Sequence, residues 1–147
     1  GMRVMDVGCG AGFATMGMAR LVGDEGKVVA VDVQPEMLAK VAKRAQQADL
    51  GHRIQTSLTP AADLKIEGQF DFVNAFYMVH EVPDQKAFLR QIYACLQPDG
   101  HFLIVEPKFH VSGKNFDRMI LTAENIGFIE INRPKLLASS AVVLTRK

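Results

Sequence analysis

The residues best suited to bind a ligand lie near the start of the sequence. Gly8, Gly10 and Gly12 stand at alternate positions just after a short apolar run, and Asp6 precedes them. A glycine-rich turn between a first strand and a first helix lets the backbone approach a ligand closely. Two kinds of ligand use such a turn: a dinucleotide, and a nucleoside that carries no phosphate.

The spacing of the glycines favours the second kind of ligand. The dinucleotide fingerprint G-x-G-x-x-G/A requires glycine or alanine at position 13 or 15, depending on the register, and Phe13 and Thr15 stand there. Strand alternation places Asp6 on the side of Gly8. A pyrophosphate about 5 Å from this carboxylate would be repelled by about 3 kcal/mol at an effective dielectric constant of about 20. The ammonium and sulfonium groups of S-adenosylmethionine would be attracted instead; a solvated carboxylate is the alternative interpretation of Asp6.

A second acidic residue fits a nucleoside. Asp32 ends the apolar run KVVAVD, 20 residues after Gly12. A carboxylate at this place in a strand–helix–strand unit binds the hydroxyls of a ribose. Asp32 therefore predicts that the ligand contains a nucleoside, but it does not distinguish a dinucleotide from a nucleoside without phosphate.

The elements that must position these residues alternate between strand and helix. Apolar, β-rich runs predict strands at 3–8, 27–33, 53–58, 70–76 and 101–106, and helical spacing predicts helices at 11–22, 35–48, 84–96 and 114–127. Two further strands, 128–133 and 141–146, follow each other without a helix and predict a closing antiparallel hairpin. This order predicts an α/β fold with a doubly wound, mostly parallel sheet and ligands at the carboxyl ends of the strands.

Composition and charge limit the class of protein. The chain has 147 residues, a net charge of +1 and 48% hydrophobic residues, which predicts one globular domain over 1–147. No long apolar run or leader is present, and the two cysteines, Cys9 and Cys95, are expected to be reduced thiols, so we expect a cytoplasmic protein without a membrane span. The scattered basic residues argue against nucleic-acid binding. No Cys/His spacing indicates a metal site.

Four stretches together resemble the successive motifs of a known family. They are VMDVGCGAGF, VVAVDVQPEML, FDFVNAFYMVHEVPDQKAFLRQIYACLQPDGHFLIVEP and ENIGF. They resemble class I S-adenosylmethionine-dependent methyltransferases, in particular the small-molecule branch similar to quinone-biosynthesis enzymes. The resemblance implies a Rossmann-like three-layer sandwich with seven strands in the order 3-2-1-4-5-7-6, the last one antiparallel. It also implies S-adenosylmethionine as cofactor and S-adenosylhomocysteine as product.

The resemblance assigns roles to residues by position. Asp32 would hold the ribose, Val33 would cover the adenine, and the adenine edge would lie near Ala61 and Ala62, followed by Asp63. The residues that would surround the methionyl part of the cofactor are Asp6, Gly8, Cys9, Gly10, Gly12, Asn74, Ala75 and Phe76.

The expected chemistry is methyl transfer to a small, partly apolar acceptor at oxygen, nitrogen, carbon or another heteroatom. An acceptor that must lose a proton needs a base. The candidates are His80 and Glu81 after the fourth strand and Glu106 and His110 after the fifth, and of these we choose His80 and His110 as the catalytic residues. Family members usually carry a helical segment before the first strand, for which this chain has no room. An upstream segment, a second copy or a partner chain would then cover the site.

Two other functions stay open on the sequence alone. A non-catalytic subunit of methyltransferase type would bind the cofactor without transferring a methyl group. A nicotinamide-dependent oxidoreductase would use the same glycine turn, although the fingerprint and Asp6 argue against it.

Overall fold

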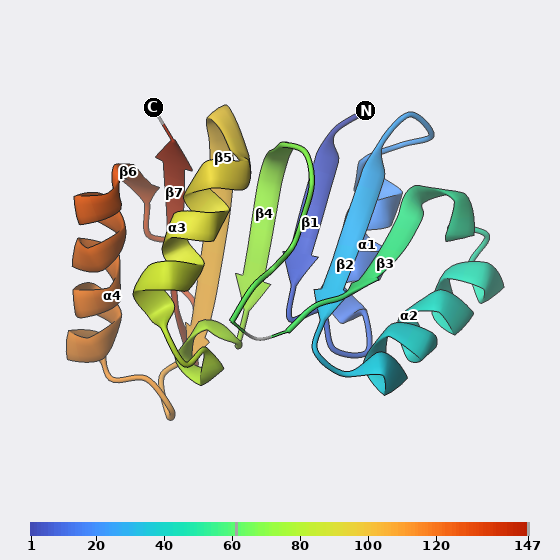
Figure 1. Cartoon of the computed structure of the whole chain (residues 1–147). Coiled ribbons are helices and arrows are strands. Elements are labelled where there is room, and N and C mark those ends of the chain that lie inside the picture. Colours follow the sequence, from blue (N-terminus) through green and yellow to red (C-terminus); the bar gives the residue numbers. More distant parts are fainter. Residues whose placement is uncertain (61, 147) are drawn as a thin grey trace.

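The computed structural model describes residues 1–60 and 62–146, and these form a sheet covered by helices on both faces (Figure 1). The strands are β1 (Arg3–Val7), β2 (Lys27–Asp32), β3 (Ile54–Leu58), β4 (Phe70–Phe76), β5 (Leu96–Pro107), β6 (Phe128–Asn132) and β7 (Ser139–Arg146). The helices are α1 (Phe13–Leu21), α2 (Pro35–Gln47), α3 (Gln85–Cys95) and α4 (Gly113–Ile126), with short 3₁₀ turns η1 (Gly51–Arg53) and η2 (Val79–Glu81).

The sheet has the predicted order, β3-β2-β1-β4-β5-β7-β6. Strands β1 to β5 pair in parallel, and β7 runs antiparallel to both β5 and β6. The prediction of a doubly wound sheet with a closing antiparallel hairpin is thereby confirmed. The carboxyl ends of β1, β2 and β4 meet at the lower edge of the sheet in Figure 1.

Strand alternation divides the core between the two faces. Met5 of β1 and Val29 of β2 are buried with the apolar residues of α3 and α4. Val4 and Val28, one position away on the same strands, are buried with those of α1 and α2. Because both faces of the central strands are covered, they are apolar along almost their whole length.

The predicted helices agree with the structure to within two residues at each end, whereas the strand predicted to begin at residue 101 begins at Leu96. Asp84 caps α3 by accepting a hydrogen bond from the amide of Ala87 at 2.9 Å, as its residue type predicts. The sequence Pro98-Asp99-Gly100, which is typical of turns, lies within β5, which begins at Leu96. Phe70 of β4 pairs with Leu96 and Phe72 pairs with His101, so the extra residues form an irregularity in the ladder rather than a separate turn.

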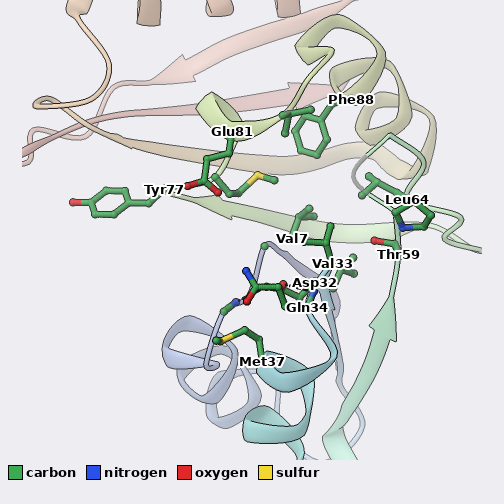
Figure 2. A pocket seen from close by; sticks show the side chains of 16 residues that line it. Val7, Asp32, Val33, Gln34, Met37, Thr59, Leu64, Tyr77, Glu81 and Phe88 are labelled. Atoms are coloured by element: carbon green, nitrogen blue, oxygen red, sulfur yellow. Dashed lines mark hydrogen bonds between the residues drawn. The ribbon is translucent and has the colours of Figure 1, made fainter.

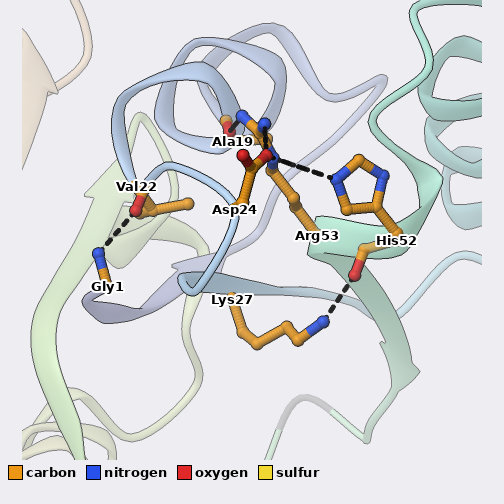
Figure 3. A network of polar contacts seen from close by, with 7 residues as sticks. All are labelled: Gly1, Ala19, Val22, Asp24, Lys27, His52 and Arg53. Atoms are coloured by element: carbon orange, nitrogen blue, oxygen red, sulfur yellow. Dashed lines mark hydrogen bonds and ion pairs between the residues drawn. The ribbon is translucent and has the colours of Figure 1, made fainter.

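Polar contacts hold the opposite edge of the sheet, where β1, β2 and β3 begin (Figure 3). Arg53 donates to the carbonyl of Ala19 at 3.1 Å and forms an ion pair with Asp24. The ammonium of Lys27 donates to the carbonyl of His52 at 2.6 Å. These contacts fix the end of α1 to the start of β3. No helix within the described ranges is both long enough and apolar enough to cross a membrane.

Candidate active site

A cavity of about 290 Å³ lies at the carboxyl ends of β1, β2 and β4 (Figure 2). Its volume is at the lower end of the range for small-molecule sites. Figure 2 shows Asp32, Gln34 and Met37 on one side of it, and Tyr77, Glu81 and Phe88 on the other. The cavity therefore lies where a doubly wound sheet is expected to bind its ligand.

The glycine turn supplies bare backbone to this cavity. Gly8 has φ +66°, and a Cβ at this residue would meet the Cβ of Met78 at 2.8 Å. Gly10 has φ +51°, but a Cβ there would meet nothing within 4 Å. Both residues line the cavity. A residue without a side chain is thus needed at position 8, because the Met78 side chain approaches the backbone closely there. At Gly10 the space beside the backbone is open and can take a ligand.

Asp32 lies beside this open space. It is 8% exposed and lines the cavity together with Val33, which is 51% exposed. One carboxylate oxygen accepts a hydrogen bond from the amide of Gly10 at 2.9 Å, and the other accepts from the amide of Gln34 at 2.9 Å. Each oxygen keeps a second lone pair for a hydroxyl donor. The carboxylate, the bare turn and the apolar surface of Val33 fit a ribose with a flat base beside it.

Asp6 is buried beside the turn and is not part of the cavity lining. Its carboxylate is 2% exposed and accepts hydrogen bonds from the hydroxyl of Thr15 at 2.6 Å and the amide of Asn74 at 2.8 Å. Burial raises the pKa of Asp6 above its ordinary value, although these two hydrogen bonds oppose the shift. Asp6 therefore ties α1 and β4 to β1 beneath the turn.

The remaining predicted cofactor residues differ in their surroundings. Cys9 is buried, and burial, followed by the charges of Asp6 and Asp32, raises the pKa of its thiol to about 12. Gly12 precedes α1 and packs against Val41. The structure thus leaves the Cys9 thiol protonated and unreactive at neutral pH.

Predicted residues on and before β4 are also dispersed. Asn74 contacts Asp6, Ala75 is fully buried in the core, and Phe76 is 45% exposed with its ring 4.3 Å from that of Tyr77. Ala62 is exposed, and Ala61 lies outside the described residues. Of the predicted cofactor residues, the structure gathers Gly8, Gly10, Asp32 and Val33 around one cavity.

The candidate bases lie around a neighbouring cavity. His80 Nδ1 is 2.5 Å from a carboxylate oxygen of Glu106, and the other oxygen of Glu106 accepts from the amide of Val79 at 3.0 Å. The ring of His110 stacks on that of His80, with 5.5 Å between the centroids. His80 Nε2 lies 3.9 Å from Glu81, whose side chain lines the first cavity. The structure therefore brings the two predicted histidines and both predicted carboxylates together.

A family model described as "Methyltransferase domain" matches residues 1–132 of the chain. The chain belongs to the methyltransferase family. A ubiquinone biosynthesis O-methyltransferase of Xanthomonas euvesicatoria is 38% identical over 106 residues, or 71% of this chain and 42% of the relative. A demethylmenaquinone methyltransferase of Lactobacillus johnsonii is 34% identical over 103 residues, or 69% and 42%. The chain thus spans about two fifths of the length of these curated relatives.

Solved structures agree with the fold of this methyltransferase chain. A SAM-dependent methyltransferase from Aquifex aeolicus superposes with a TM-score of 0.87 at 22% identity, covering 97% of this chain and 81% of the other. The predicted resemblance to class I S-adenosylmethionine-dependent methyltransferases, including those of quinone biosynthesis, is confirmed by these matches.

Several residues that line the first cavity could not be predicted from the sequence. The walls of this cavity include residues from the segments that follow β3 and β4 and from two helices, which no spacing rule connects to the glycine turn. Those not predicted as cofactor contacts are Val7, Val31, Gln34, Met37, Thr59, Pro60, Leu64, Tyr77, Met78, Glu81, Val82 and Phe88. Gln34 and Met37 could have been found, because they follow Asp32 at the start of α2. Thr59 needed the pairing of β3 with β2, which places its amide 3.1 Å from the carbonyl of Asp32.

Proposed function

We propose that this chain binds S-adenosylmethionine in the first cavity and transfers its methyl group to a small, partly apolar acceptor. The observation that carries the proposal is the joint presence of the bare turn at Gly10 and the carboxylate of Asp32 in one cavity. The bound cofactor would supply a methyl group already activated by the sulfonium. We further propose that 1–147 acts as a single cofactor-binding domain.

The residues of the first cavity would bind and orient. Asp32 would accept hydrogen bonds from the ribose hydroxyls while it holds the Gly10 amide. Val33 would cover one face of the adenine, and the open space at Gly10 would take the methionyl part. Correct orientation of the methyl group toward the acceptor can lower the barrier by about 7–11 kcal/mol, so binding geometry is the main contribution of these residues.

His80 is the residue proposed to remove a proton from the acceptor. Its Nδ1 faces the buried carboxylate of Glu106, and an ionised carboxylate can only accept a hydrogen bond. In the neutral ring the hydrogen therefore lies on Nδ1 and the lone pair on Nε2. That lone pair is what a base needs. His110, stacked on the His80 ring, would limit its rotation and is the second candidate. A hydroxyl placed at Nε2 would lose its proton as its oxygen attacks the methyl group.

The curated relatives point to the acceptor class. One is named for an O-methylation in ubiquinone biosynthesis and another for the methylation of demethylmenaquinone. Both names describe ring compounds of the quinone type. We therefore propose a hydroxylated aromatic ring as the acceptor, methylated on oxygen.

Calorimetric titration with S-adenosylmethionine, S-adenosylhomocysteine and NADH is the first test. We expect both adenosyl compounds to bind and NADH not to bind. Transfer of a labelled methyl group from S-adenosylmethionine to catechol and to simple hydroquinones is the second test, and a methyl ether is the expected product. Cofactor binding without transfer to any small acceptor would instead favour the non-catalytic subunit, and binding of NADH alone would overturn the proposal.

A further inference from the structure

A second cavity, of about 370 Å³, shares no lining residue with the first. It is bounded by His80, Glu106 and His110 on one side and by α4 on the other. His80 and Glu81 are neighbours in the sequence, yet His80 lines the second cavity and Glu81 lines the first. The proposed base therefore stands at the boundary between the two cavities.

One face of α4 supplies polar groups to this second cavity. Asn115, Arg118 and Thr122 are three and four residues apart, so they lie on the same side of the helix. Within residues 1–60 and 62–146, the guanidinium of Arg118 forms no hydrogen bond or ion pair. Arg133, by contrast, contacts both Glu130 and Asp117. Arg118 therefore brings a positive charge with unused donors to the cavity.

Among the described residues, the carboxylate that lines the same cavity makes no ion pair with Arg118. Glu106 is 1% exposed, and its two oxygens already accept from Val79 and His80. Glu81 is near His80 Nε2, but its side chain lines the other cavity. The second cavity thus offers a ligand the unused hydrogen-bond donors of Arg118.

Apolar side chains complete the lining. Val111 is partly buried and Met119 is 6% exposed, and both line the cavity beside the polar residues. An apolar wall next to a guanidinium suits a ring that carries an anionic group. The planar fork of a guanidinium matches the two oxygens of a carboxylate, which favours a carboxylate as that group.

We propose that the second cavity binds a carboxylate substituent on the aromatic ring of the acceptor, with Arg118 as its anchor. The inference rests on the proposed function insofar as it treats the ring as the methyl acceptor. With the carboxylate at Arg118, a hydroxyl on the same ring can face His80, which lines the same cavity. Arg118 would determine which acceptors are bound and would take no part in the proton transfer.

The test compares two probes that differ only in the carboxylate. Binding of 3,4-dihydroxybenzoate and of catechol is measured calorimetrically, with and without S-adenosylhomocysteine, for the unmodified chain and for Arg118→Gln, Arg118→Lys and Arg90→Gln. Arg90 is an exposed arginine of α3 that lines neither cavity, so it is the matched control. NMR signals from the ring C–H groups of His80 and His110 report whether the probe enters the second cavity.

We expect the carboxylate probe to bind about three- to tenfold more tightly than catechol, as a partly exposed charge pair allows. Arg118→Gln should remove this preference without changing the affinity for catechol, Arg118→Lys should keep part of it, and Arg90→Gln should keep all of it. Equal binding of both probes, or a preference that survives Arg118→Gln, would overturn the inference. Arg118-dependent binding of the carboxylate probe without any methyl transfer would support the carboxylate subsite and contradict the proposed function. Methyl transfer together with equal binding of the two probes would support the proposed function and contradict the subsite.

Discussion

The carboxylate of Asp32 holds the amide of Gly10 at 2.9 Å, so the end of β2 fixes the glycine turn that follows β1. The second carboxylate oxygen accepts from the amide of Gln34, at the start of α2. Two backbone segments therefore depend on one side chain that also lines the cavity. Asp32 thus links the shape of the turn to the ribose binding that we propose.

Replacing Asp32 should affect both binding and stability. In Asp32→Ala the cofactor loses a charged acceptor worth about 1.5–3 kcal/mol, which corresponds to about 10- to 150-fold weaker binding of S-adenosylmethionine. Two backbone amides also lose their acceptor, so the free energy of unfolding should fall by about 1–3 kcal/mol. Calorimetric titration and urea unfolding measure the two effects. Asp32→Asn, which keeps one carbonyl acceptor, should lose less stability; unchanged cofactor binding in Asp32→Ala would leave Asp32 with a structural role alone.

Gly10 should tolerate no side chain. Gly10→Ala places a Cβ at φ +51°, which costs about 1–2 kcal/mol of stability, and Gly10→Val fills the open space of the cavity. We expect the affinity for S-adenosylmethionine to be highest in the unmodified chain, lower in Gly10→Ala and lowest in Gly10→Val. Gly17→Ala is the control, because Gly17 lies within α1, has equal free space and should gain up to about 1 kcal/mol from the better helix former. Full affinity in Gly10→Val would exclude the turn from the cofactor site.

Asp6 should make stability depend on pH. Since its pKa is raised mainly by burial, the folded chain holds this proton to a higher pH than the unfolded chain does. The contribution of Asp6 is therefore fully present below about pH 4 and is lost as the pH rises through its folded-state pKa. The stability of the unmodified chain relative to Asp6→Asn should decrease from pH 4 to pH 8.

Urea unfolding at several pH values measures this difference. Asp99→Asn, the same substitution at an exposed position, is the matched control. A relative stability that is constant or rises with pH would show that the Asp6 carboxylate is better stabilised in the folded chain than in water. It would then also be available as a fixed negative charge below the glycine turn.

The fold was predictable because apolar runs and helical spacing alternate without interruption, and because no helix separates 128–133 from 141–146. Asp32 and Gly10 were predictable because their places in a strand–turn–helix unit follow from the chain order. The burial of Asp6 was not predictable, because it depends on hydrogen bonds from Thr15 of α1 and Asn74 of β4. Alternation along a strand gives the face of a side chain, but the depth of burial follows from what the neighbouring elements place above it.

The arrangement of the base was partly predictable. His80 and Glu81 follow β4, Glu106 lies near the end of β5 and His110 follows it. The carboxyl ends of these two strands are adjacent because the strands pair in parallel. The exact pairing of these side chains depends on Tyr77, which adopts φ +59° and turns the chain sharply after β4. A positive φ is unfavourable for a tyrosine, and nothing in the residue type predicts it. The hydrogen bond between Tyr77 and Ser139, at 2.5 Å, anchors this turn to β7.

His80 and Glu106 give the sharpest test of the proposed chemistry. His80→Gln removes the base and should lower kcat for catechol by about 10²- to 10⁴-fold while leaving S-adenosylmethionine binding unchanged. Glu106→Gln keeps a group of the same shape at Nδ1 but no longer fixes the hydrogen there, so kcat should fall by less. His101→Gln, at an exposed histidine of β5, is the matched control.

An acceptor that is already ionised separates proton removal from positioning. The hydroxyl of 4-nitrocatechol is far more acidic than that of catechol, so most of it needs no base at neutral pH. If His80 acts as the base, the loss of kcat in His80→Gln should nearly vanish with 4-nitrocatechol and remain with catechol. Since Glu106 acts only through His80, the loss in Glu106→Gln should follow the same pattern. Equal losses with both acceptors would instead mean that the His80–Glu106 pair holds the segment after β4 in place and transfers no proton.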